Sequence, residues 1–161
     1  KGIQIMADKR VYMYEGMFLF SQATASDFGG MIAHLNDVLQ RGHAEVVAMQ
    51  KWDERRLAYE IDGQKRGVYI LVYFRAPGSD VAHIERDCNL SEKIMRAQIL
   101  RADHLSEEEI LAKDGRKDLE VESKLRAERA ASQQAVTAGA PTASNESDEG
   151  ESEGGEDAEN N

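Results

Sequence analysis

The sequence predicts an α+β domain in which four strands and two helices follow one another in the order β-α-β-β-α-β. Two stretches with apolar residues at three- and four-residue spacing indicate the helices. Stretches of alternating side chains around them indicate the strands, and the two middle strands form one long hairpin. Right-handed crossovers place both helices on one face of a four-stranded antiparallel sheet, with the first and third strands at its centre. This is the split βαβ, or ferredoxin-like, arrangement.

The first strand and the first helix are predicted at residues 10–20 and 27–41. One face of the strand should lie in the core because it is bulky and uncharged; it carries Tyr12, Tyr14, Gly16, Phe18 and Phe20. Apolar residues recur on one side of the helix from Phe28 to Leu39. Ser26 is the expected N-cap, and Gly42 is expected to end the helix in a left-handed conformation.

The central hairpin is predicted to pair residues 44–62 with residues 68–76. Gly63 and Gly67 bracket a polar connection, residues 64–66, which we expect to form the turn. Successive strand residues point to opposite faces. One face of the second arm should therefore pack on the helices, because it is wholly apolar: Val68, Ile70, Val72, Phe74 and Ala76. The other face should stay uncovered and suits a partner surface: Tyr69, Leu71, Tyr73 and Arg75.

The second helix is predicted at residues 80–89 after a cap at Ser79, with Val81, Ile84 and Cys88 on its buried side. Cys88 is the single cysteine, so it can form no internal disulfide, and we interpret it as a small buried hydrophobe. The last strand is predicted at residues 93–101. One face of this strand should carry Met95, Ala97 and Ile99, and the other Arg96, Gln98 and Leu100.

Charge and composition divide the 161 residues into four parts. Residues 1–104 carry 14 basic and 14 acidic side chains, whereas residues 105–161 carry 6 and 16, which accounts for the net charge of −10. We predict an N-terminal extension at 1–9, a folded domain at 10–104, a marginal helical extension at 105–135 and a disordered acidic tail at 136–161. The folded domain is near neutral, so the low pI does not exclude a nucleic-acid partner.

The pattern of residues excludes several functional classes. No apolar run approaches the ~20 residues that span a bilayer, and the first residues lack the features of a signal peptide, so we expect a cytoplasmic protein with no membrane partner. The four histidines show no metal-ligand spacing, and no phosphate-binding loop is present. We therefore expect no catalytic residue, no metal, no cofactor and no small-molecule substrate.

Basic and aromatic residues of the strands remain as candidates for function. Guanidinium groups pair with phosphate oxygens, and exposed rings can stack on bases. A solvated face that balances nearby acids is the other interpretation; for the adjacent pair Arg55 and Arg56 we favour function. An RNA-recognition motif is not favoured, because Val68 and Ile70 replace its stacking aromatic residues.

Several motifs between residues 10 and 101 resemble the bacterial small-subunit ribosomal protein S6 family. They are Tyr14-Glu15, Trp52, the run Arg55-Arg56-Leu57-Ala58-Tyr59-x-Ile61, Gly67-x-Tyr69, Pro77, the pattern of Val81, Ile84, Cys88 and Leu90, and Ile94-x-Arg96. The Arg-Arg-Leu-Ala-Tyr run is the most specific of them. This chain departs from the family at Asp53, where Gly is common, and at Glu60, where Pro is usual.

The resemblance implies a ferredoxin-like protein of the small ribosomal subunit without enzymatic activity. It also implies binding to small-subunit (16S) ribosomal RNA together with ribosomal protein S18. The candidate contacts with the RNA or the protein partner are Arg10, Arg55, Arg56, Tyr59, Tyr69, Tyr73, Arg96 and Arg101. The alternative is a regulatory or small-molecule-binding domain that acts as a homodimer, which would need a pocket with convergent polar groups.

Overall fold

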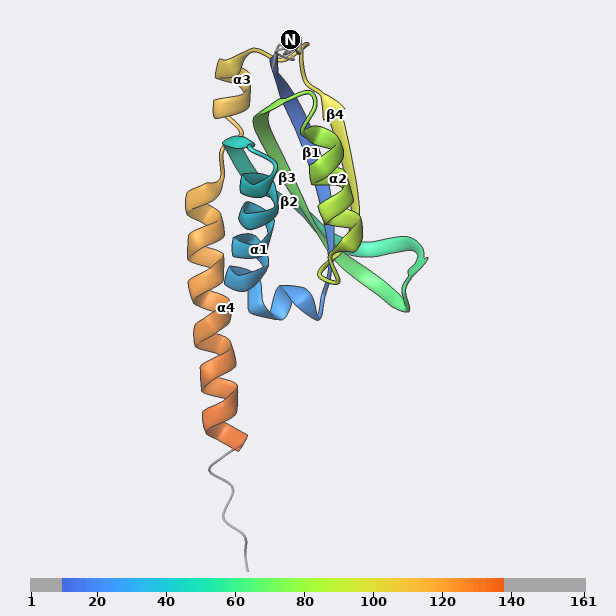
Figure 1. Cartoon of the computed structure of the whole chain (residues 1–161). Helices are drawn as coiled ribbons and strands as arrows, with labels where there is room; N and C mark the ends of the chain where they lie inside the picture. The colour runs from blue at the N-terminus through green and yellow to red at the C-terminus, as the bar shows by residue number, and fades with distance from the viewer. Residues whose placement is uncertain (1–9, 138–161) are drawn as a thin grey trace, which may run out of the picture.

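A computed structural model describes residues 10–137, which form one antiparallel sheet with the helices α1 (Phe28–Arg41) and α2 (Val81–Leu90) on one face (Figure 1). The elements are β1 (Val11–Ser21), α1, β2 (Glu45–Ile61), β3 (Gln64–Pro77), α2, β4 (Ile94–Arg101), α3 (Glu107–Leu111) and α4 (Arg116–Thr137). The strand order is β2-β3-β1-β4, so the first and third strands are central. The ferredoxin-like prediction is confirmed. The predicted extension at 1–9 and residues 138–161 of the tail predicted at 136–161 lie outside the described residues, whereas residues 136 and 137 belong to α4.

The main core lies between the sheet and the two helices α1 and α2. It contains the predicted aromatic face of β1 and the apolar face of β3, including Phe18, Phe20, Ile70 and Phe74. The buried side of α2 is also as predicted, with Ile84 and Cys88 fully enclosed. Met95 differs from its prediction. A register shift between Leu19 and Phe20 interrupts the β1–β4 pairing, and Met95 packs in a separate cluster with Leu19 instead of with the main core.

The predicted last residue of α1, Arg41, is confirmed, whereas the predicted N-cap and the predicted left-handed residue are each wrong by one position. Asp27 is the N-cap, because its carboxylate accepts a hydrogen bond from the Gly30 N–H at 3.0 Å. Ser26 instead donates its hydroxyl to the Ala23 carbonyl in a short 3-10 turn. At the other end, Gly42 has φ −84° and His43 takes the left-handed conformation at φ 53°. Gly42 is needed for another reason, since a Cβ there would collide with the Ile84 side chain of α2.

The turn of the central hairpin also differs from the prediction. Asp62 and Gly63 both have positive φ, 48° and 75°, which is the backbone of a two-residue hairpin turn. The residues predicted to form the turn, 64–66, are the first residues of β3. Pairing of β1 with β3 ends at Ser21 and Gly67, so the tip of the hairpin projects beyond the rest of the sheet (Figure 1).

The sheet face opposite α1 and α2 is partly covered, contrary to the prediction that it stays open. Residues 102–116, which we call the C-terminal strap, run across it. Ile110 of α3 packs there with Val47, Leu71 and Tyr73. The strap is bonded to the central strand β1 and to the edge strand β2, since Ala102 N–H donates to Met13 O and Gly115 N–H donates to Met49 O, each at 2.9 Å. Only the half of this face nearer the hairpin tip remains free of the strap.

The predicted marginal extension at 105–135 contains α3 and most of a long helix, α4, that lies beside α1 (Figure 1). Leu119 enters the main core. The Ser123 hydroxyl lies against Gly29, where an added Cβ would be 2.7 Å from its oxygen and would require that hydroxyl to turn away. Further along, Arg126 donates to Glu54 at 2.7 Å and to the Ala25 carbonyl at 3.0 Å.

We expect acid to weaken the docking of α4 through Glu54. Burial alone would raise the pKa of this carboxyl, but its hydrogen bond with Arg126 and the charges of Arg126 and Lys51 outweigh burial and lower it. A lowered pKa contributes stability that is present above the ordinary value of about 4.5 and lost as the pH falls below it. Hydrogen exchange of α4 in the wild type and in Glu54→Gln should therefore differ at pH 7 and converge near pH 3. A difference that is independent of pH would contradict this.

Cys88 should be inert in the folded protein. Burial, aided by the nearby charges of Asp87 and Glu85, raises the pKa of its thiol to about 12. The thiolate is the reactive form of cysteine, so we expect no alkylation by iodoacetamide at pH 8 under native conditions and complete alkylation in denaturant. Mass spectrometry of the intact chain measures both. Rapid native alkylation would show that α2 opens readily.

Candidate nucleic-acid interface

The two arginines singled out in the sequence lie on opposite faces of the projecting hairpin. Arg56 is in register with Arg66 of β3, whereas Arg55 is in register with Gly67. Directly opposed strand residues share a face, with Cβ atoms about 5 Å apart, and neighbours along a strand do not. The structure therefore pairs Arg56 with Arg66, a residue assigned to the turn from the sequence, and separates both from Arg55.

Arg56 and Arg66 form a like-charged pair at the surface. Both side chains are exposed, and neither makes an ion pair with any residue between 10 and 137. Opposed like charges destabilise a strand pair, so a bound anion would relieve the repulsion. Arg55 is different, because Asp53 lies 3.7 Å from its guanidinium and partly neutralises it.

The three aromatic candidates differ in how much of each side chain is exposed. The ring of Tyr59, on the hairpin, is 71% exposed. Tyr69 is half-buried and meets Trp52 edge-to-face, with 5.7 Å between ring centroids. Trp52 is itself 51% exposed and was not among the predicted contacts, although it belongs to the motif that suggested the family. Tyr73 lies beneath the strap.

Tyr73 is therefore a correction to the predicted surface, because only 1% of it is exposed. Its hydroxyl donates to Glu15 at 2.7 Å and accepts from Lys113 of the strap at 3.2 Å. Burial, together with the hydrogen bond to Glu15, raises the pKa of this hydroxyl. In this conformation its side chain is closed to a partner.

The three remaining arginines lie away from the hairpin tip. Arg96 is exposed on β4, in register with Leu19, on the sheet face that the strap leaves partly free. Arg101 lies over the Tyr12 ring, 3.8 Å from its centroid, and pairs with Asp103 at 2.7 Å. Arg10 precedes β1 at that same far end, where its carbonyl accepts a hydrogen bond from Gly78. The structure thus places Arg55, Arg56 and Tyr59 on the projecting hairpin, with Arg55 on the opposite face from Arg56, and places Arg10 and Arg101 at the other end of the sheet.

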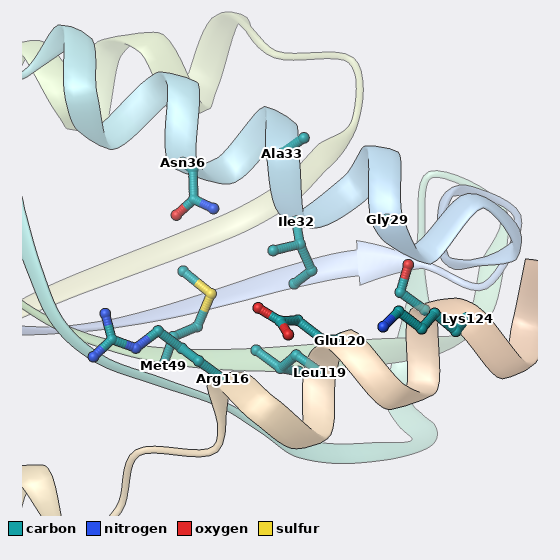
Figure 2. A pocket seen from close by; sticks show the side chains of 10 residues that line it. Gly29, Ile32, Ala33, Asn36, Met49, Arg116, Leu119, Glu120 and Lys124 are labelled. Carbon is teal, nitrogen blue, oxygen red and sulfur yellow. The ribbon is translucent and has the colours of Figure 1, made fainter.

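A cavity of about 410 Å³ lies between α1 and α4 (Figure 2). Its lining is mainly apolar, with Ile32, Met49 and Leu119. Arg116 and Lys124 lie at opposite ends of it in Figure 2 and do not converge on one point. A small-molecule site needs a few convergent polar groups, so this cavity gives no support to the alternative of a small-molecule-binding domain.

Metal sites and membrane-spanning helices are both absent from the described residues. Between residues 10 and 137, no three His, Cys, Asp or Glu side chains come together in a way that could hold a metal ion. No helix in that range is long and apolar enough to cross a bilayer.

Comparison with known proteins agrees with the motifs. The family described as Ribosomal protein S6 matches residues 13–101, which is more than half of the chain. The small ribosomal subunit protein bS6 of Protochlamydia amoebophila is 35% identical over 103 residues, covering 63% of this chain and 90% of that protein. The corresponding protein of Rhodopirellula baltica is 33% identical over 104 residues, covering 64% and 74%.

A solved structure shows the same fold. The crystal structure of 30S ribosomal protein S6 from Thermotoga maritima superposes with a TM-score of 0.55 at 23% identity, covering 64% of this chain and 98% of that one. The relatives are named as ribosomal proteins, which agrees with the expectation that this chain is not an enzyme. With more than half of its length matched by the family and its fold shared with a solved member, the chain belongs to the ribosomal protein S6 family.

Proposed function

We propose that this chain is a structural component of the small ribosomal subunit that binds 16S ribosomal RNA together with ribosomal protein S18. The observation that carries the RNA part is the exposed, like-charged pair of Arg56 and Arg66 on the projecting hairpin, neither of which forms an ion pair with residues 10–137. The names of the relatives support the assignment to the small subunit. Such a role would place the chain on the ribosome in the bacterial cytoplasm.

The hairpin would act as an electrostatic anchor. Each guanidinium can donate two parallel hydrogen bonds to a phosphate, and a phosphate between Arg56 and Arg66 would turn their repulsion into attraction. Contacts of this kind fix position and orientation on the RNA and carry no sequence information by themselves. The protein would thus dock by shape and charge, with Arg55 contributing from the other face of the hairpin.

The free half of the sheet face suits a protein partner. Leu19, Leu57 and Ile61 form a buried apolar cluster there, and the partly buried Tyr69 and Met95 pack against it. The apolar surface exposed beside this cluster is the Trp52 ring, which is 51% exposed and contacts Tyr69. Exposed apolar surface next to charged residues marks protein interfaces, and aromatic residues are enriched in them. This half of the face is where we place ribosomal protein S18, with Arg96 at its edge.

The test is a binding titration of the full chain on 16S ribosomal RNA, with and without ribosomal protein S18, at several salt concentrations. We expect tight binding only when both proteins are present, and an affinity that falls steeply as salt rises, because phosphate contacts release counterions. Binding that ignores salt would overturn the hairpin anchor. Failure to bind the RNA in the presence of ribosomal protein S18 would overturn the proposed function.

A further inference from the structure

The hairpin contains an unusually large bulge. Arg56 pairs with Arg66, and the next pair towards the tip joins Ile61 to Gln64. Residues 57–60 of β2 therefore face Lys65 alone, so β2 carries three extra residues where an ordinary bulge has one. The residues of this segment, which we call the β2 bulge, therefore lack one-to-one register partners on β3.

The β2 bulge is held at both ends. Leu57 and Ile61 are buried in the cluster with Leu19, whereas Ala58, Tyr59 and Glu60 between them are exposed. Burial on either side fixes where the exposed segment begins and ends, and bulges commonly re-aim a side chain towards a functional site. The side chain aimed outward here is Tyr59, whose ring leaves more of its surface exposed than any other large apolar residue in the described part of the chain.

The surroundings of Tyr59 combine a ring with cations. A cavity of about 130 Å³ beside it is lined by Arg56 and Lys65 as well as by the β2 bulge, including the carboxylate-bearing Glu60. An exposed ring offers a stacking surface for a base, and neighbouring cations offer contacts to the phosphates on either side of that base. Because bases in a duplex are already stacked, only an unpaired nucleotide can present its face to such a ring.

We infer that the β2 bulge is a receptor for a single unpaired nucleotide of RNA, whose base stacks on Tyr59 while Arg56 and Lys65 hold its flanking phosphates. The inference rests on the proposed function and adds the class of RNA feature that the hairpin takes. It assigns Tyr59 a role separate from the electrostatic anchor, because stacking does not depend on counterion release. The cations beside the ring favour RNA over a protein partner at this place. The experiments below distinguish the two.

The first experiment compares Tyr59→Leu and Tyr59→Phe for binding to 16S ribosomal RNA with ribosomal protein S18 present. Loss of a base–aromatic stack should lower the affinity roughly tenfold in Tyr59→Leu, with the salt dependence unchanged. Tyr59→Phe keeps the ring and should bind as the wild type does. Because Tyr59 is exposed, both variants should melt at the wild-type temperature. Wild-type affinity in Tyr59→Leu would overturn the inference and leave the proposed function intact.

The second experiment identifies the nucleotide. Ultraviolet crosslinking of the wild-type complex should attach Tyr59 to one unpaired residue of the RNA, and an RNA fragment with an abasic site there should lose about the same factor of affinity. Tyr59→Leu should lose nothing further on the abasic RNA, because both changes remove one contact. If Tyr59→Leu and the abasic site each lowered the affinity independently, so that their factors multiplied in the combination, the inference would be overturned. Weaker binding of Tyr59→Leu to ribosomal protein S18 without RNA would also overturn it, because that result would make the bulge a protein contact. No binding of the wild type to RNA would overturn the proposed function as well.

Discussion

Replacing Ile110 by Asp lowers the free energy of unfolding by about 3 kcal/mol, whereas the same replacement at Leu111 changes it by about 0.5 kcal/mol or less. Ile110 is 0% exposed and anchors the C-terminal strap on Val47, Leu71 and Tyr73. Its neighbour Leu111 is 50% exposed on the outer side of α3. A carboxylate at position 110 would either be buried without a partner or force the strap off the sheet.

Denaturant unfolding measures the difference, and hydrogen exchange shows where it arises. In Ile110→Asp, protection should be lost at the Gly115 amide, which donates to Met49, and at the Ala102 amide, which donates to Met13. Protection of the β1–β3 pairing should persist, since the main core is separate from the strap. Equal effects of Ile110→Asp and Leu111→Asp would show that the strap is not seated on the sheet.

The double variant Arg56→Gln with Arg66→Gln weakens binding to 16S ribosomal RNA about a hundredfold, because two charge-assisted hydrogen-bonding contacts of roughly 1.5 kcal/mol each are lost. The slope of log affinity against log salt should become shallower by about 1 for each phosphate contact removed. The variant should not melt at a lower temperature than the wild type, because the substitution also removes the repulsion between opposed arginines.

Arg86→Gln is the matched control. Arg86 is an exposed arginine on α2, away from the hairpin, so its replacement makes a charge change of the same kind at a site with no proposed RNA contact. It should leave both the affinity and the salt slope nearly unchanged. If a single Arg86→Gln change weakened binding as much as the hairpin variant does, net charge rather than the hairpin would govern binding.

The sequence predicted the structure best where side chains alternate regularly along a strand and one face of that strand is buried. The alternation along β1 and β3 assigned Phe18, Phe20, Ile70 and Phe74 to the core, and the structure places them there. A strand whose pairing shifted by one residue would turn its apolar side to water. The alternation of apolar residues therefore strongly disfavours such a shift in register. The element order and the strand order follow from the same alternation and from the handedness of the crossovers.

The strap could not be predicted from a local pattern. Ile110 lies in a short, strongly charged segment, and its partners Val47 and Leu71 are far away in the chain. Ser106 and Glu109 form a capping box at the start of α3, but a cap says nothing about where a helix packs. The alternation along β3 predicts correctly which face of the sheet Tyr73 lies on. It cannot show that the strap covers that face, and so Tyr73 was wrongly predicted to be exposed.

The register between the two strands of the hairpin could not be predicted from the sequence either. The Asp62-Gly63 pair is a recognised two-residue turn signal, and with regular pairing it would set Arg66 opposite Tyr59. The three extra residues of the β2 bulge move Arg66 to face Arg56 instead. The turn itself is present, and the regular pairing is interrupted beyond it, where Leu57 and Ile61 both reach the cluster around Leu19. A tertiary contact of this kind cannot be predicted from the turn residues.

Directed cleavage of RNA from the hairpin tests the central claim most directly. Because Cys88 is buried and its thiol is held in the protonated form, an iron chelate can be attached selectively to a new cysteine in Gln64→Cys at the hairpin tip, or in Ala82→Cys on the exposed side of α2 as the control. In complexes with ribosomal protein S18 and 16S ribosomal RNA, hydroxyl radicals from the hairpin probe should cut the RNA strongly at one place, and those from α2 only weakly. Strong cutting from α2 with none from the hairpin would contradict the account.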